Sequence, residues 1–138
     1  MNHPALRLWL ATAALAATSA HAQNCVQVEV HNLRPQQGML MVAAYTEAAD
    51  FNKKPASTLQ MRAGAETMRF SLCGLDGPSV ALALYQDVNG NGQLDRSVLG
   101  VPTEPWGASG KPPAFAAPTW ETSQVPLDGS AIVVQLSK

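Results

Sequence analysis

The sequence has no cluster of basic residues. Its 138 residues include nine Lys plus Arg and ten Asp plus Glu, which gives a formal net charge of −1. Nucleic acids and anionic membrane surfaces are bound by concentrated Lys and Arg. The balance of charge over the chain therefore argues against both as partners, and no nucleic-acid function is expected.

The sequence also lacks an apolar run long enough to span a bilayer, which takes about 20 residues. Its longest apolar run, Leu8 to Ala17, follows Arg7 and precedes Ala20-His21-Ala22, which fits the small-x-small cleavage rule. We predict a signal peptide over residues 1–22 and a single domain over residues 23–138. A membrane-anchoring helix is the alternative. The mature chain is expected to be periplasmic or secreted and to have no membrane span.

Cysteine and histidine are scarce. Cys25 and Cys73 do not form a CxxC pair, and His31 is the one histidine left after the predicted cleavage, so a metal or catalytic role for the cysteines has little support. Two cysteines in an exported protein are more often paired than free. We predict a Cys25–Cys73 disulfide that contributes about 4 kcal/mol on the chain-entropy estimate. Two buried thiols are the alternative.

No window of helical periodicity reaches the length of a normal helix, and the apolar pattern alternates instead. Two segments alternate strictly between apolar and polar residues. Three others are more uniformly apolar, as central or closing strands are. These five segments are CVQVEV (residues 25–30), TMRFSL (67–72), MLMVAAY (39–45), SVALALY (79–85) and SAIVVQL (130–136). Together with the spacing of Gly and Pro they predict an all-β fold, namely a single antiparallel immunoglobulin-like or prealbumin-like β-sandwich of about seven strands.

Weaker patterns suggest further elements. Ser57 to Arg62, a short piece around Val98, and Pro113 to Thr122 are candidate strands. Glu47 to Lys53 is long enough for one helical turn.

Two consecutive Asn-Gly pairs flanked by acids occur in QDVNGNGQLD, residues 86–95. This pattern matches positions 1, 3, 5 and 6 of the D-x-[DN]-x-[DN]-G calcium loop. Val98 occupies position 12, where that loop needs a bidentate Glu, so an EF-hand is excluded and any Ca²⁺ affinity is expected to be weak. The predicted metal ligands are Asp87, Asn89, Asn91, Gln93 through its carbonyl, Asp95, and Glu104 from the following loop. The alternative is that Asp87 and Asp95 only cap turns.

Three motifs in this order resemble the bacterial domain of unknown function 2141 family. They are Asp87 to Asp95 (D-x-N-x-N-G-x-L-D), Gly100 to Glu104 (G-x-P-x-E) and Trp106 to Ser109. The resemblance covers almost the whole mature chain and implies an exported β-sandwich with no assigned activity. Gln86 and Ala108 stand where relatives often carry His and an aromatic residue.

Catalytic groups are hard to find in this composition. Ser109, His31 and Asp95 make a nominal triad, but nothing in the sequence brings His31 close to Ser109. Asp95 and Glu104 could serve a glycosidase, although a domain of this size leaves little room for a substrate cleft. We therefore expect no enzyme, and a small hydrolase is the least favoured interpretation.

The sequence favours an exported accessory or scaffolding module that binds an unknown envelope or extracellular partner. The alternative is a carbohydrate- or peptide-binding module that uses residues 86–110, with Trp106 and Ser109 as ligand contacts, because an aromatic face can stack on a sugar or on a peptide side chain. No cofactor other than weakly bound Ca²⁺ is expected.

Overall fold

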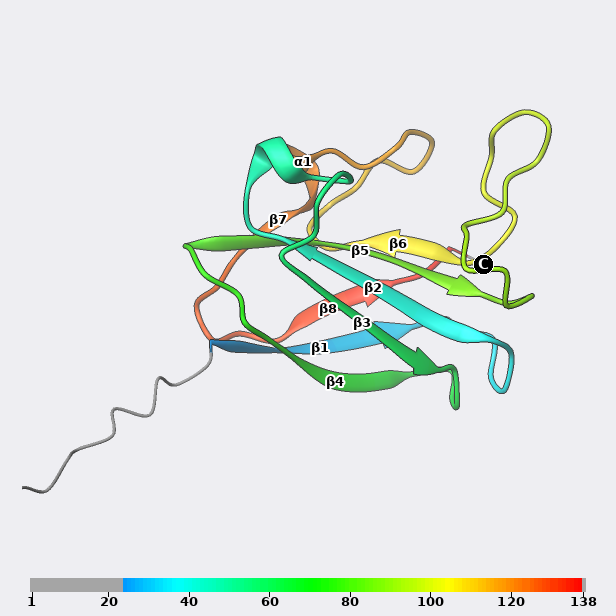
Figure 1. Cartoon of the computed structure of the whole chain (residues 1–138), viewed down its shortest axis with the longest axis horizontal. Coiled ribbons are helices and arrows are strands. Elements are labelled where there is room, and N and C mark those ends of the chain that lie inside the picture. Colours follow the sequence, from blue (N-terminus) through cyan, green and yellow to red (C-terminus); the bar gives the residue numbers. More distant parts are fainter. Residues whose placement is uncertain (1–23, 138) are drawn as a thin grey trace, which may run out of the picture.

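The computed structural model describes residues 24–137, which form a sandwich of two β-sheets (Figure 1). One sheet has the strand order β4-β1-β8, and the other has the order β3-β2-β5-β6, with β7 also paired to β5. The predicted signal peptide lies outside the described residues. Within residues 24–137, no helix combines the length and the hydropathy needed to cross a membrane.

The strands are β1 (Cys25–His31), β2 (Met39–Tyr45), β3 (Ser57–Arg62), β4 (Met68–Cys73), β5 (Ser79–Asp87), β6 (Trp106–Ala108), β7 (Gln124–Pro126) and β8 (Ile132–Gln135). Two short helices, η1 (Ala48–Asp50) and α1 (Trp120–Ser123), lie in the connections. The predicted β-sandwich and the predicted single turn near residue 50 are thus confirmed. The finer assignment to an immunoglobulin-like or prealbumin-like fold stays a prediction.

The core lies between the two sheets and follows the alternation of the sequence. In β1 the side chains of Val26, Val28 and Val30 are buried, whereas Gln27 is exposed. The uniformly apolar β2 and β5 occupy central positions in the larger sheet, as predicted. Successive side chains of a strand point to opposite faces, so β2 and β5 also place small and apolar side chains on the outer face of that sheet.

One strand pair departs from the antiparallel pattern, because β8 runs parallel to β1, with Val28 opposite Ile132. The cause is the path of the chain. β7 ends beside the start of β5, where Leu127 N–H donates to the Pro78 carbonyl (2.9 Å). The chain then enters the smaller sheet at the end where β1 also begins, so β8 runs in the same direction as β1 (Figure 1).

Two of the weaker strand predictions are wrong. The segment around Val98 makes only an isolated bridge between Arg96 and Pro102, and no part of Pro113 to Thr122 is a strand. Residues 113–119 form a loop, because the prolines at positions 112, 113 and 118 have no N–H to donate to a ladder, and residues 120–122 belong to α1. The third candidate, Ser57 to Arg62, is confirmed as β3. β6 and β7 span three residues each, too few for an alternating pattern to reveal.

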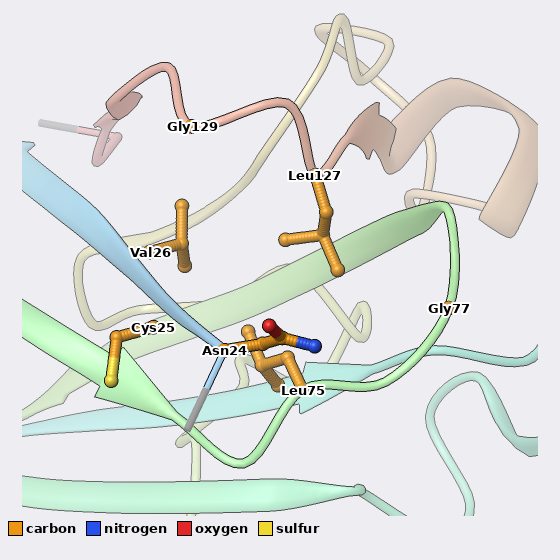
Figure 2. Close-up of a pocket in the computed structure, with 7 residues that line it drawn as sticks. All are labelled: Asn24, Cys25, Val26, Leu75, Gly77, Leu127 and Gly129. Atoms are coloured by element: carbon orange, nitrogen blue, oxygen red, sulfur yellow. The ribbon is translucent and has the colours of Figure 1, made fainter. Parts of the chain in front are cut away.

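The predicted disulfide is present. Cys25 and Cys73 lie directly opposite each other in the register of β1 and β4 and are bonded. Beside them is a hollow of about 370 Å³, lined by Asn24, Val26, Leu75 and Leu127 among others (Figure 2). No charged side chain lines this hollow, so we assign no chemistry to it.

Candidate functional site

The outer face of the larger sheet carries an aromatic pair between two long loops. The register places Tyr85 of β5 directly opposite Trp106 of β6, and Ala43 of β2 opposite Ala83 of β5. All four residues belong to the lining of one hollow. The two alanines have small side chains and so leave space above the sheet. Together with the neighbouring rings of Tyr85 and Trp106 they form the floor of the hollow.

This hollow is a groove of about 770 Å³, within the usual size range of ligand sites. One wall comes from the loop between β5 and β6, including Leu99, Val101 and Pro102. The opposite wall comes from residues 114–118, with Phe115 at its edge. Both loops rise from the same side of the sheet (Figure 1). The groove is therefore open to solvent and mainly apolar.

The side chain of Tyr85 connects the floor of the groove to the Asn-Gly loop. Its hydroxyl donates a hydrogen bond to the Gly92 carbonyl (3.0 Å). Partial burial raises the pKa of Tyr85 above its ordinary value, and the nearby charges of Asp87 and Glu104 add to this. The phenol therefore stays protonated at neutral pH and remains a donor.

Asp87, the last residue of β5, folds the Asn-Gly loop around its own carboxylate. Its side chain is only 3% exposed. Oδ1 accepts the N–H groups of Gly90 (2.9 Å) and Asn91 (3.2 Å), and Oδ2 accepts that of Gly92 (2.8 Å). This is the capping role that the turn interpretation assigns to Asp87.

The carboxylate of Asp95 accepts its hydrogen bonds from side chains rather than from backbone N–H groups. The amide nitrogens of Asn89 and Asn91 both donate to its carboxylate, the latter over 2.8 Å. The side-chain amide oxygen of Asn91, Oδ1, accepts the N–H of Gln93 (3.0 Å). Two predicted metal ligands, Asn89 and Asn91, thus donate hydrogen bonds to the carboxylate of a third, Asp95.

Glu104 reaches the same loop from the following segment, as the sequence suggested. Its buried carboxylate accepts the N–H of Val88 on Oε1 (2.8 Å) and that of Asp95 on Oε2 (3.0 Å). Within residues 24–137, no three His, Cys, Asp or Glu side chains are grouped so that they could hold a metal ion. A cation at this loop would therefore need amide and main-chain oxygens as well.

Gln86 holds the base of the loop, a role that the sequence analysis missed. It is fully buried, and its amide nitrogen donates to the carbonyls of Arg34 (2.7 Å) and Gln37 (2.6 Å). Its amide oxygen accepts the N–H of Arg34 (2.8 Å). A polar residue on the inward face of a strand as apolar as SVALALY was the available signal, since buried amides need partners.

Ser109 does not contribute to the groove. It is fully buried, its Oγ accepts the Leu82 N–H (2.8 Å) and donates to the Ser123 carbonyl (2.5 Å), and it is not among the groove-lining residues. The predicted ligand contact at Ser109 is thus not supported by its position, whereas the predicted contact at Trp106 lies in the groove.

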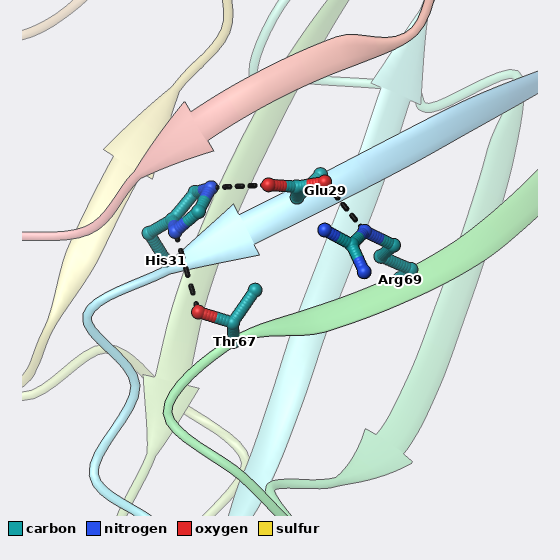
Figure 3. A network of polar contacts seen from close by, with 4 residues as sticks. All are labelled: Glu29, His31, Thr67 and Arg69. Atoms are coloured by element: carbon teal, nitrogen blue, oxygen red, sulfur yellow. Dashed lines mark hydrogen bonds and ion pairs between the residues drawn. The ribbon is translucent and has the colours of Figure 1, made fainter.

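The nominal triad is not assembled either, because His31 lies on β1 in the smaller sheet and has other partners. It contacts Glu29 (2.6 Å) and Thr67 (3.3 Å), as Figure 3 shows. Arg69 donates to the same glutamate, and this bond, together with His31, lowers the pKa of Glu29 below its ordinary value. The His31 network is therefore separate from Ser109 and Asp95.

Comparison with known proteins gives a family and no activity. Neither the curated proteins nor the solved structures contain a match to the chain. A family model described as "Uncharacterized protein conserved in bacteria (DUF2141)" matches residues 28–135, which include both sheets, the Asn-Gly loop and the floor of the groove. The chain therefore belongs to the DUF2141 family.

Proposed function

We propose that this protein is an exported, non-catalytic accessory module that binds an apolar peptide segment of an envelope or extracellular partner in the groove. The observation that carries the proposal is the pair Tyr85 and Trp106, side by side on the floor of an open groove of about 770 Å³. Aromatic rings supply a large apolar contact area at a small cost in side-chain entropy.

The chemistry of the lining favours a peptide with apolar side chains over a carbohydrate. Most lining residues are Ala, Leu, Val, Pro or aromatic, and the polar side chains Asn52, Arg96 and Ser137 are a minority. A sugar ring stacked on Trp106 would present several hydroxyls, each of which needs a hydrogen-bond partner on binding. This lining offers few such partners, whereas an aliphatic or aromatic side chain needs none.

The same lining supports a non-catalytic role. Its residues include no His, Cys, Asp or Glu. His, Asp and Glu are the most common general acids and bases, and the tyrosine hydroxyls of the lining, Tyr45 and Tyr85, are weak acids whose pKa burial raises further. The two buried carboxylates nearest the groove, Asp87 and Glu104, are occupied by backbone N–H groups of the loop.

Fluorescence of Trp106 provides the test. In a Trp120→Phe background, Trp106 is the remaining tryptophan of the predicted mature chain. We expect a saturable change in its emission on titration with synthetic peptides that carry Phe or Leu, and none with soluble oligosaccharides. Trp106→Ala in the parent, assayed by calorimetry with the same peptides, should weaken binding by about 2 kcal/mol or more, roughly thirtyfold in the dissociation constant.

Gln60→Ala is the matched control, because Gln60 is an exposed residue of β3 and does not line the groove. It should bind peptide as the parent does. Saturable binding of oligosaccharides in place of peptides would replace the peptide assignment by the carbohydrate one. Binding of peptides that is unchanged by Trp106→Ala would contradict the groove as the site.

A second candidate function, weak Ca²⁺ binding at the Asn-Gly loop, is favoured by the convergence of Asn89 and Asn91 on Asp95. Rotating the two amide groups would turn their oxygens towards the carboxylate and gather the hard oxygen ligands that Ca²⁺ prefers. Asp87 and Glu104 would supply further negative charge close by, and the carbonyl of Gln93 remains a candidate ligand. The ion would stiffen the loop that forms one wall of the groove.

Thermal and urea unfolding with and without Ca²⁺ test this site. At a concentration about 100 times the dissociation constant, Ca²⁺ should raise the free energy of unfolding by about 2.7 kcal/mol. Asp95→Asn should remove most of that gain, because it deletes the central charge. Asp76→Asn, in an exposed loop outside the cluster, is the control and should keep it. Equal stabilities of the parent in chelator and in millimolar Ca²⁺ would leave the loop as a turn.

A further inference from the structure

The two loops that form the groove walls carry large apolar side chains that are almost fully exposed to solvent. Val98 is 103% exposed and Leu99 86% exposed in the first loop, and Phe115 is 102% exposed in the second. Val101 is exposed as well. Such side chains are unfavourable in water, and several of them together on one side of a soluble domain indicate a binding surface.

These residues share one side of the molecule. Leu99, Val101 and Phe115 all line the rim of the same groove, and both loops project from the outer face of the larger sheet (Figure 1). We call Val98, Leu99, Val101 and Phe115 the apolar rim. Although three of the rim residues line the edge of the groove, all four side chains are largely exposed to solvent, so they can enter the apolar phase of a bilayer without a partner of complementary shape.

The charged side chains within the two loops are cationic, although the chain as a whole is slightly acidic. Residues 96–103 contain Arg96 and no Asp or Glu, and residues 110–120 contain Lys111 and no Asp or Glu. Acids flank both stretches: the carboxylates of Asp95 and Glu104 accept hydrogen bonds within the Asn-Gly loop, and Glu121 lies in α1, six positions after Phe115. Apolar tips flanked by cations are the combination that holds a peripheral protein at an anionic lipid surface.

We propose that the apolar rim inserts reversibly into the headgroup region of a bilayer that contains anionic phospholipid, with Arg96 and Lys111 at the level of the phosphates. The chain has no cluster of basic residues, so the apolar side chains of the rim would supply most of the binding and the two cations would add to it. This inference does not depend on the peptide ligand of the groove. Membrane contact would place the open groove next to the surface where envelope partners reside.

Flotation with vesicles tests the proposal. The mature protein should float with vesicles of phosphatidylcholine mixed with phosphatidylglycerol, and more weakly with phosphatidylcholine alone. The double variant Val98→Ser/Phe115→Ser should lose about a hundredfold in partition coefficient, because each change removes an apolar side chain from the lipid phase. Lys111→Gln should lose about fivefold on the mixed vesicles and little on the neutral ones.

Val133→Ser is the matched control, since Val133 is an exposed valine (55%) on β8, outside both loops. It should float as the parent does, and Trp106→Ala should still float, which separates this proposal from the groove. Circular dichroism would verify that each variant is folded. Absence of flotation for the folded parent, flotation of the double variant at the parent's level, or binding of the rim to peptides without any vesicle binding would each overturn the proposal.

Discussion

Replacing Gly38 by alanine is expected to destabilise the protein by about 4 kcal/mol or more, from the sum of a backbone strain and an overlap. Gly38 precedes β2 and has a φ of +63°, a conformation that L-residues with a side chain rarely adopt. A Cβ at this position would lie 1.9 Å from the Asp87 carbonyl oxygen and 2.8 Å from the Val88 Cα. Both neighbours are backbone atoms, so no side-chain rotation can relieve the overlap.

Urea unfolding of three alanine variants separates the two contributions. Gly64→Ala is the control, since Gly64 has neither a positive φ nor a neighbour within 4 Å, and it should stay within about 0.5 kcal/mol of the parent. Gly90 has a φ of +76° and open space around it, so its alanine variant should show the strain alone, about 1–2 kcal/mol. A Gly38→Ala variant as stable as Gly90→Ala would contradict the close approach of the chain before β2 to the end of β5.

Removing the Cys25–Cys73 disulfide is expected to lower the free energy of unfolding by about 4 kcal/mol on the chain-entropy estimate. The bond closes a loop with a sequence separation of 48 residues, and its loss lets the unfolded chain sample many more conformations. The native state should change little, because β1 and β4 stay paired along their length from Cys25 opposite Cys73 to Val30 opposite Met68.

Unfolding of the parent in the presence and absence of a reductant, and of Cys25→Ala/Cys73→Ala, measures this effect. The reduced parent and the double variant should be destabilised to a similar degree, and the reductant should have no effect on the double variant. A thiol assay of the unfolded, unreduced parent should detect no free thiol. Equal stability of the reduced and oxidised parent would contradict a stabilising disulfide.

The local pattern of apolar and polar residues was sufficient to predict much of the fold. The strict alternation of Val26, Val28 and Val30 predicted a strand with one buried face, and the uniformly apolar segments of β2 and β5 predicted central strands, because burial and side-chain period are properties of a short stretch. The presence of two cysteines after a predicted signal peptide predicted the disulfide. The same local reasoning failed for residues 113–119, where proline removes the N–H groups that a strand needs.

Long-range contacts decided the candidate site. No short-range rule places Tyr85 opposite Trp106, since their pairing depends on how a loop of 18 residues between β5 and β6 returns the chain to the sheet edge. The buried positions of Gln86 and Ser109 are equally non-local, because their partners Arg34 and Leu82 lie in other segments of the chain.

The sequence by itself determined the class of the fold, the identity of the central strands, the disulfide partners and the residues of the Asn-Gly loop, because each of these follows from the composition or period of a few neighbouring residues. Only the tertiary structure decided that β8 runs parallel to β1, that Ser109 is buried while Trp106 forms the floor of a groove, and that Val98 and Phe115 project from one side. These features depend on which segments pack together after the chain has crossed from one sheet to the other. The contacts that stabilise this packing join residues far apart in the sequence, so no short stretch reveals them.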